Sequence, residues 1–337
     1  MSTSTFVTYA TDPNIMRLLE VVLPDLQAVE ERIQQEISSP VRTIWSLGGH
    51  VLSSGGKRLR PALVCLSAYA TGLPVDRNRL IPLAAVAELM HMATLIHDDV
   101  VDNTATRRGR PTASALFGNG VTVLTGDYLL AKAMHLLIED GDLAILRTVS
   151  QVAIEMSEGE VLQMIYTSDP SISEQTYFDI IRKKTAVFIQ GCCRAGALVA
   201  NAPQPVVEAL SDYGYHAGMA FQIADDLLDY TGNPARMGKP VGNDLREGKF
   251  TLPLIIALRE ATPADRQRIL QILGSPVRDG EIQQVIEFIR RYDGFSQTQA
   301  VAEHHARRAV EALSRLPESP IRQSLIALCD YIVQRDL

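Results

Sequence analysis

Apolar residues recur along this chain with the period of an α-helix. Nearly every apolar run has helical spacing and helical length, whereas alternating, strand-like runs between turn residues are hard to find. Helix-start signals agree with this pattern. Ser171 with Glu174 predicts a capping box, and Thr262 and Ser319 each precede a proline that suits the first turn of a helix. The pattern therefore predicts an all-α fold.

The segment from Thr231 to Gly248 is the most informative interruption of the helical pattern. Its sequence, TGNPARMGKPVGNDLREG, is rich in Gly, Pro and Asn. A loop of this length in a compact protein is typically a functional lid or is disordered. The lysines that bracket it, Lys239 and Lys249, favour the lid because they suit a bound polyanion.

The five-residue pattern DDxxD occurs twice, each time after an apolar stretch of helical period. Its acidic members are Asp98, Asp99 and Asp102 in the first copy and Asp225, Asp226 and Asp229 in the second. On a helix each trio lies on one face, where carboxylates repel one another unless a cation neutralises them. A solvated helix cap explains one such trio equally well, but two copies favour a metal site. Mg²⁺ suits this site because it takes one or two carboxylates and keeps its other positions for water and phosphate oxygens.

Length, composition and charge narrow the class of protein. A chain of 337 residues suggests about two domains on length alone. Matched aspartate trios must meet to act together, however, so we predict a single domain over residues 1–337. A hydrophobic content of 46% and a charged content of 21% are typical of a soluble globular protein. The net charge of -7 provides no basic field for nucleic acid.

Cysteine usage and hydropathy predict a cytoplasmic protein without a transmembrane segment. The four cysteines show no CxxC spacing, so neither a zinc site nor a disulfide framework is indicated. The first residues lack the basic start and apolar core of a secretory signal. No stretch of about 18 uncharged apolar residues is found, so no membrane span is predicted.

Basic residues gather at three further places. The segment GGKRLRP, residues 55–61, puts two glycines before three cations at a predicted helix start, which is typical of a phosphate site. RRGRP, residues 107–111, follows the first aspartate trio, and Lys184 with Thr185 lies in a mostly apolar helical stretch. GGKRLRP alone is equally compatible with a solvated basic turn, an isolated RRGRP would more often be ordinary surface, and Lys184 could instead extend to the edge of its helix. Catalytic nucleophile motifs such as GxSxG are not found. A metal site, separated cationic clamps and an apolar interior together suit diphosphates that carry hydrocarbon tails.

The motifs closely resemble the trans-isoprenyl diphosphate synthases, which are head-to-tail prenyltransferases. The resemblance covers almost the whole chain through eight ordered segments: GGKRLRP, ELMHMATLIHDDVVD, RRGRPTA, GDYLL, KTA, FQIADDLLD, GKPVGND and EGKFTLP. It implies a single all-α bundle around a central cavity, usually a homodimer, in which both aspartate motifs face the cavity. It also implies a reaction that joins isopentenyl diphosphate to an allylic diphosphate and releases pyrophosphate.

The same resemblance assigns roles to individual residues. It implies that Mg²⁺ is bound by Asp98, Asp102, Asp225 and Asp229, with support from Asp99 and Asp226. The residues implied to hold the allylic substrate are Arg107, Lys184, Thr185, Gln222, Lys239 and Lys249. The residues implied to hold isopentenyl diphosphate are Lys57, Arg60, His91 and Arg108.

Product length is predicted from the wall of the cavity. Ala93 and Thr94 lie about one turn before the first aspartate trio, where short-chain members commonly carry a bulky aromatic residue. Both residues are small here, which favours an open cavity past this turn over the alternative of ordinary helix packing. The first motif, DDVVD, also lacks the two-residue insertion of many short-chain enzymes. We therefore predict a product longer than geranylgeranyl diphosphate.

Other functions fit parts of the sequence. A farnesyl or geranylgeranyl diphosphate synthase would carry the same site with a shorter cavity. A class I terpene cyclase would normally carry an Asn/Asp-Ser/Thr-Glu second metal motif in place of DDLLD and would not need GGKRLRP. A non-catalytic subunit of a heteromeric synthase tends to lose its aspartate trios, and a structural helical protein that merely binds Mg²⁺ would leave the basic clusters without a role.

Overall fold

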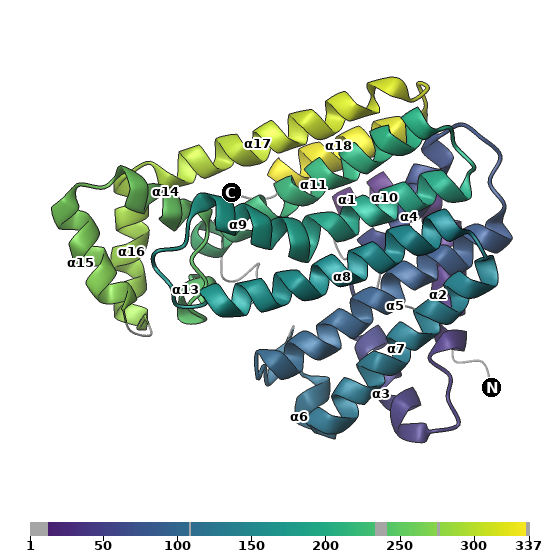
Figure 1. The fold of residues 1–337 in the computed structure, drawn as a ribbon, viewed down its shortest axis with the longest axis horizontal. Helices are drawn as coiled ribbons and strands as arrows, with labels where there is room; N and C mark the ends of the chain where they lie inside the picture. The colour runs from purple at the N-terminus through teal and green to yellow at the C-terminus, as the bar shows by residue number, and fades with distance from the viewer. Residues whose placement is uncertain (1–12, 108, 233–240, 275–276, 335–337) are drawn as a thin grey trace. The chain divides into compact units, whose positions relative to one another are not determined.

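The computed structural model describes residues 13–107, 109–232, 241–274 and 277–334, and these form helices joined by short connections (Figure 1). In this part of the chain the strands are β1 (Thr106–Arg107) and β2 (Arg110–Pro111), which pair antiparallel with Thr106 opposite Pro111. The predicted all-α fold is confirmed.

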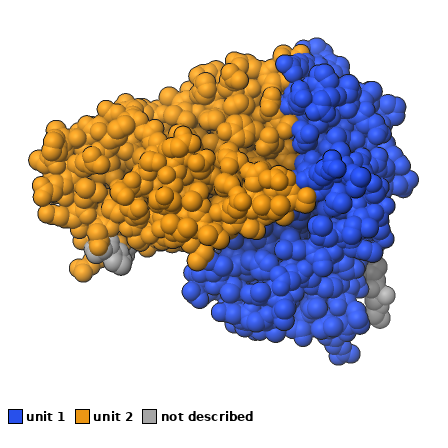
Figure 2. All heavy atoms as spheres, in the orientation of Figure 1, with its two compact units in different colours: residues 1–149, 192–210, 315–325 blue, residues 150–191, 211–314, 326–337 orange. Residues whose placement is uncertain are grey.

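The chain divides into two compact units, which are coloured separately in Figure 2. Unit 1 comprises residues 1–149, 192–210 and 315–325, and unit 2 comprises residues 150–191, 211–314 and 326–337. The single domain over residues 1–337 stays a prediction.

Helices of the first half of the chain belong mainly to unit 1. They are α1 (Pro13–Leu19), η1 (Glu20–Val22), α2 (Leu23–Glu36), α3 (Arg42–Ser53), α4 (Leu59–Ala70), α5 (Arg77–Val101), α6 (Ala113–Phe117) and α7 (Asn119–Asp140). The core of this unit is built around α5, which packs against α2, α4 and α7. Small residues such as Ala84, Ala85 and Ala93 are fully buried on α5 and allow its neighbours to approach closely.

Unit 2 contains two hydrophobic clusters, and both include residues of α11 and α14. Its elements include α9 (Glu174–Ile181), η2 (Arg182–Ala186), α13 (Asn243–Arg246), α14 (Leu252–Glu260), α15 (Pro263–Leu273), α16 (Asp279–Arg291) and α17 (Gly294–Ala312). Residues Leu252–Leu258 of α14 are all buried, as expected for a helix that is apolar on every side. Leu254 packs in the cluster with α15 and α16, whereas Ile255 packs in the cluster with α9 and α17.

Five further elements contribute residues to both units. They are α8 (Leu143–Tyr166), α10 (Val187–Val199), α11 (Gln204–Thr231), η3 (Leu313–Arg315) and α18 (Pro320–Gln334).

The predicted helix starts are partly confirmed. Thr262 caps α15 by accepting from the Asp265 amide, and the Ser319 hydroxyl accepts from the Arg322 amide at the start of α18. The capping box at Ser171 is wrong. The amide and hydroxyl of Ser171 both donate to Asp169 Oδ1, at 2.8 and 2.6 Å, so an Asx turn forms there instead. The helix begins two residues later, and Ser173 is its cap.

Two described helices, α5 and α7, are long and apolar enough to cross a membrane by length and composition alone. The apolar window of α5 is 67% buried within the protein and that of α7 is 39% buried. Core helices of soluble proteins pass the same test. The predicted absence of a transmembrane segment therefore stays a prediction.

Candidate active site

The first aspartate motif lies at the C-terminal end of α5. Asp98 is half-buried, Asp99 is buried, and Asp102 is exposed at the C-cap, where its amide donates to the Asp98 carbonyl. The carbonyl end of a helix carries partial negative charge, so carboxylates there are unfavourable until a cation neutralises them. Asp99 is engaged by the protein itself, because Arg107 Nε donates to its Oδ1 at 2.8 Å.

The predicted phosphate segment GGKRLRP forms the turn that leads into α4. Gly55 and Arg58 both have left-handed backbone conformations, with φ of 76° and 46°. Lys57 is exposed and Arg60 is half-buried in the first turn of α4, so both cations lie at the positive end of a helix dipole. Arg58 differs, because it is buried and points into unit 1.

The remaining predicted residues of unit 1 lie along α5 and in the turn that follows it. His91 and Thr94 are half-buried, and the Thr94 hydroxyl donates to the His91 carbonyl at 2.8 Å. Ala93 has no exposed surface. Of the predicted chain-length pair, Thr94 is thus the residue with accessible surface. Arg108 lies outside the described residues.

The second aspartate motif lies near the C-terminal end of α11 and shows a different distribution of exposure. Asp225 is exposed, whereas Asp226 is 5% and Asp229 is 1% exposed. The Asp229 Oδ2 atom accepts from the Asp244 amide at 3.0 Å, and the Asp229 carbonyl accepts from the Gly242 amide at 2.8 Å. The described end of the predicted lid, from residue 241, therefore folds onto the end of α11. Lys239 lies outside the described residues.

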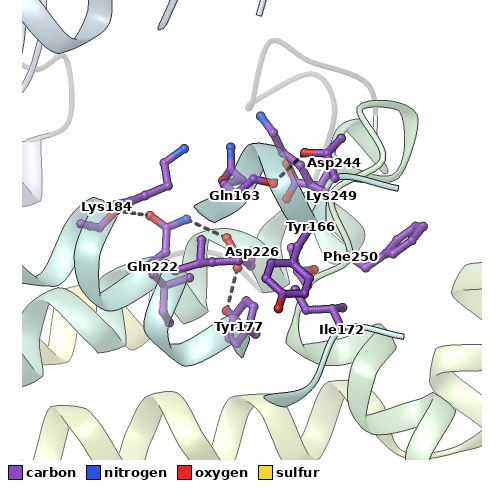
Figure 3. A pocket seen from close by; sticks show the side chains of 15 residues that line it. Gln163, Tyr166, Ile172, Tyr177, Lys184, Gln222, Asp226, Asp244, Lys249 and Phe250 are labelled. Atoms are coloured by element: carbon purple, nitrogen blue, oxygen red, sulfur yellow. Dashed lines mark hydrogen bonds between the residues drawn. The ribbon is translucent and has the colours of Figure 1, made fainter. Parts of the chain in front are cut away.

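Asp226 is the centre of a hydrogen-bond chain that joins three elements of unit 2 (Figure 3). Tyr177 Oη donates to Asp226 Oδ2 and Gln222 Nε2 donates to Asp226 Oδ1, both at 2.7 Å. The Thr185 hydroxyl in turn donates to Gln222 Oε1 at 2.7 Å. Burial raises the pKa of Asp226 to about 7, and the hydrogen bonds from Tyr177 and Gln222 oppose that rise. Like Asp99, this middle aspartate is held by protein donors.

Lys184 and Thr185 lie in η2, which is a π-helical segment. Such segments interrupt an α-helix by one wide turn and are frequent at functional sites. Two glycines let neighbouring helices approach it. A Cβ atom on Gly159 of α8 would lie 2.8 Å from Lys183 Cβ, and one on Gly218 of α11 would lie 2.6 Å from Ala186 Cα. The approach of α11 brings Gln222, one turn after Gly218, within reach of Thr185.

The side chains of Lys184, Thr185, Gln222 and Asp226 line one cavity of about 200 Å³ in unit 2 (Figure 3). Its walls are formed by Gln163, Tyr166, Thr167, Ile172, Tyr177, Ile180, Ile181, Lys184, Thr185, Gln222, Asp226, Asp244, Lys249, Phe250 and Thr251. Lys184 Nζ lies 2.8 Å from Glu160 Oε1, and Lys249 Nζ lies 2.7 Å from Glu247 Oε2. The cavity thus combines two ammonium groups with apolar walls, which suits an anionic head group with an apolar neighbour.

The aspartate motifs have the chemistry of a magnesium site. Among the described residues, no group of three or more His, Cys, Asp and Glu side chains converges to hold an ion alone. Mg²⁺ does not require such a group, because it is commonly held by one or two carboxylates plus water and phosphate oxygens. Asp98 and Asp102 offer a carboxylate pair one turn apart, and Asp225 offers an exposed carboxylate on the second motif. Each motif, taken by itself, therefore offers carboxylate oxygens that suit the ion when a diphosphate supplies remaining ligands.

The sequence motifs do not indicate four residues of the candidate site. Tyr177 and Asp244 line the cavity, and the glycines Gly159 and Gly218 shape it. Asp244 is the last residue of the GKPVGND segment, so an acidic residue in a segment that contains two glycines was an available signal. Tyr177 and the glycines lie in ordinary helical sequence, and only the packing of the helices reveals them.

Comparisons with known proteins identify the family. The polyprenyl synthetase family model matches residues 42–289. The octaprenyl diphosphate synthase of Escherichia coli (strain K12) is 38% identical over 323 residues, covering 96% of this chain and 99% of that protein. A crystal structure of a decaprenyl diphosphate synthase from Rhodobacter capsulatus has a TM-score of 0.90 at 37% identity, covering 96% of this chain and 99% of that one. A polyprenyl synthase from Caulobacter crescentus CB15, complexed with calcium and isoprenyl diphosphate, has a TM-score of 0.88 at 35% identity, covering 96% and 98%.

The family match extends over more than half of the chain, and the similarity to solved structures extends over nearly all of it. The predicted isoprenoid synthase fold and the predicted prenyltransferase class are confirmed by these comparisons. This chain therefore belongs to the polyprenyl synthetase family, whose members the eight sequence motifs resemble.

Proposed function

We propose that this protein is a Mg²⁺-dependent prenyltransferase that extends an allylic diphosphate with isopentenyl diphosphate to a product longer than geranylgeranyl diphosphate. The observation that carries the proposal is the cavity of unit 2. It gathers Lys184 and Thr185 from η2, Gln222 and Asp226 from α11, and Lys249 from the connection between α13 and α14. These are the residues that the family resemblance assigns to the allylic substrate and to the second aspartate motif.

Different residues of the cavity have different roles in binding an allylic diphosphate. Lys184 and Lys249 offer positive charge to the phosphate oxygens, and Glu160 and Glu247 restrain their ammonium groups until substrate arrives. Gln222 is held in one orientation by Thr185 and Asp226, which leaves little freedom for its amide to rotate. Apolar walls such as Ile180 exclude water from the carbon beside the diphosphate.

The reaction breaks the bond between the allylic carbon and its diphosphate oxygen and forms a carbon–carbon bond to isopentenyl diphosphate. The new bond leaves a cation that loses a proton, and we assign that proton to the departing pyrophosphate. Bound Mg²⁺ supplies charge that stabilises the leaving diphosphate. The protein contributes position, charge and a dry cavity, so the site requires no nucleophilic side chain.

Two observations support a long product. The relatives include an octaprenyl and a decaprenyl diphosphate synthase. At the two positions of α5 where short-chain members commonly carry an aromatic residue, this chain carries Ala93 and Thr94, of which Thr94 has accessible surface.

A homodimer is part of the proposal. The exposed stripe of α7 includes Leu124 and Ile138, with exposed fractions of 68% and 65%, together with Val121 and Met134. Apolar side chains repeated along one helix are typical of a surface covered by a partner. Light scattering should give a mass of twice 37.0 kDa, and a monomeric mass at working concentration would contradict this part of the proposal. The cytoplasmic location, the absence of a membrane span and the absence of a nucleic-acid partner stay predictions.

The function is tested by incubating purified protein with isotopically labelled isopentenyl diphosphate, Mg²⁺ and an allylic primer. We expect pyrophosphate release and label in an acid-labile prenyl product only when all three are present, and loss of both signals with excess EDTA. Release of pyrophosphate from the primer alone, with a cyclic hydrocarbon product, would identify a terpene cyclase. Inactivity with every primer would instead favour a non-catalytic subunit.

A further inference from the structure

Of the cations of GGKRLRP, Arg58 is buried, whereas Lys57 is exposed and Arg60 is half-buried. The Arg58 side chain is 6% exposed. Its Nε atom donates to Glu30 Oε2 at 3.0 Å, its Nη1 atom donates to Glu88 Oε1 at 2.6 Å, and its Nη2 atom donates to the Leu52 carbonyl at 3.0 Å. A single guanidinium thus links α2, the end of α3, the start of α4 and the middle of α5.

The backbone at Arg58 is also unusual. With φ of 46° it adopts the left-handed conformation at the N-cap of α4, which is unfavourable for a residue with a long side chain. Such a conformation persists only where surrounding contacts impose it, and the three hydrogen bonds of the guanidinium supply those contacts. Lys57 lies one residue before Arg58, and Arg60 lies two residues after it.

Charged groups are concentrated around Arg58. Two buried carboxylates, Glu30 and Glu88, contact its guanidinium, and the charge of Glu88 also acts on Arg60. Glu30 Oε1 accepts no hydrogen bond from the residues that the structure describes. Burial raises the pKa of Glu30, and the charge of Glu88 raises it further against the opposing effect of Arg58. Buried ion pairs contribute little net stability compared with apolar side chains of similar volume. Stability alone therefore does not explain why this position carries three charged groups.

We propose that Arg58, through Glu30 and Glu88, is a positioning residue that sets the turn bearing Lys57 and Arg60 against α5. Glu88 lies on the same helix as His91 and Asp98. The hydrogen bond from Arg58 to Glu88 therefore fixes Lys57 and Arg60 relative to the first aspartate motif. The inference rests on the proposed function, in which Lys57 and Arg60 hold the diphosphate of isopentenyl diphosphate. Arg58 itself does not contact substrate in this scheme.

The test separates positioning from stability with two variants. Arg58→Lys keeps the charge, but a single ammonium cannot span two carboxylates and a carbonyl. The triple variant Glu30→Gln/Arg58→Met/Glu88→Gln removes every charge and should regain most of the melting temperature that Arg58→Lys loses. In both variants we expect the KM for isopentenyl diphosphate to rise by roughly tenfold or more, with the allylic KM within about twofold of wild type. Lys57→Ala provides the reference KM for loss of one cation that binds isopentenyl diphosphate.

Arg79→Met is the matched control. Arg79 also lies on α5 and also pairs with two carboxylates, Asp140 and Asp142, but it lies near the other end of that helix. This variant should lower the melting temperature and leave both KM values unchanged. A folded Arg58→Lys or triple variant with the wild-type KM for isopentenyl diphosphate would overturn the positioning role while the proposed function stands.

An inactive wild-type protein would refute the proposed function instead. Calorimetric titration with inorganic pyrophosphate then tests the same role, because Arg58→Lys should weaken binding as much as Lys57→Ala does. Unchanged pyrophosphate binding in Arg58→Lys, alongside weakened binding in Lys57→Ala, would overturn the positioning role on its own.

Discussion

The variant Gly218→Ala tests whether the close approach of α11 to η2 builds the allylic pocket. A Cβ atom at this position would lie 2.6 Å from Ala186 Cα, whereas ordinary contact begins near 3.4 Å, so the two segments must separate by about 0.8 Å. The hydrogen bond between Thr185 and Gln222 measures 2.7 Å and would lengthen to about 3.5 Å, where it is effectively lost.

The expected effects follow from these distances. Alanine gains about 1 kcal/mol of helix propensity over glycine, but overpacking a buried contact costs about 1–3 kcal/mol, so the net change should be modestly destabilising. A displacement of this size at a substrate clamp should lower kcat/KM for the allylic substrate by roughly tenfold to a hundredfold. The KM for isopentenyl diphosphate should stay near its wild-type value, because the residues assigned to this substrate, such as Lys57 and Arg60, belong to unit 1.

Initial rates against allylic concentration, together with thermal unfolding, measure both effects. Gly49→Ala is the matched control, because Gly49 lies inside α3 and an added Cβ meets no atom within 4 Å. That variant should be as active as wild type and at least as stable. Wild-type allylic kinetics in folded Gly218→Ala would refute the argument that helix proximity sets the pocket.

Three further predictions concern the metal-binding aspartates, the lysines assigned to the two substrates, and the residue predicted to limit product length. Asp98→Asn and Asp225→Asn should each fold normally and lower kcat by at least about a hundredfold, and near-normal turnover at saturating Mg²⁺ would contradict the metal assignment. Lys57→Ala should raise the KM for isopentenyl diphosphate more than the allylic KM, and Lys184→Ala should do the reverse; equal shifts in steady-state kinetics would show that the pockets are misassigned. Thr94→Phe should shorten the product while preserving the first condensation, and chromatography that shows unchanged length would place the length determinant elsewhere.

Chemistry that depends on spacing within one helix could be predicted from the sequence. The repeated aspartate pattern after apolar stretches indicated two acidic helix ends, and both motifs lie at the C-terminal ends of long helices, α5 and α11. Local chemistry also predicted the cations at the start of α4, because glycine followed by basic residues is typical of a phosphate turn.

Features that depend on packing between distant segments could not be predicted. The sequence does not distinguish Arg58 from its basic neighbours, since the difference arises from Glu30 and Glu88 on other helices. The π-helical turn at η2 gives no sequence signal. The burial of Asp229 likewise follows from the fold of residues 241–248 onto α11, so the two aspartate motifs share a pattern but differ in exposure.

The central claim is that this single chain elongates an allylic diphosphate beyond geranylgeranyl length. The most direct measurement is mass spectrometry of the products that purified protein forms from isopentenyl diphosphate, Mg²⁺ and each allylic primer in turn. The account predicts polyprenyl diphosphates longer than the geranylgeranyl product, formed by this protein without a second kind of subunit. A product that stops at farnesyl or geranylgeranyl diphosphate would contradict the long-chain assignment, and no condensation with any primer would contradict the proposed activity itself.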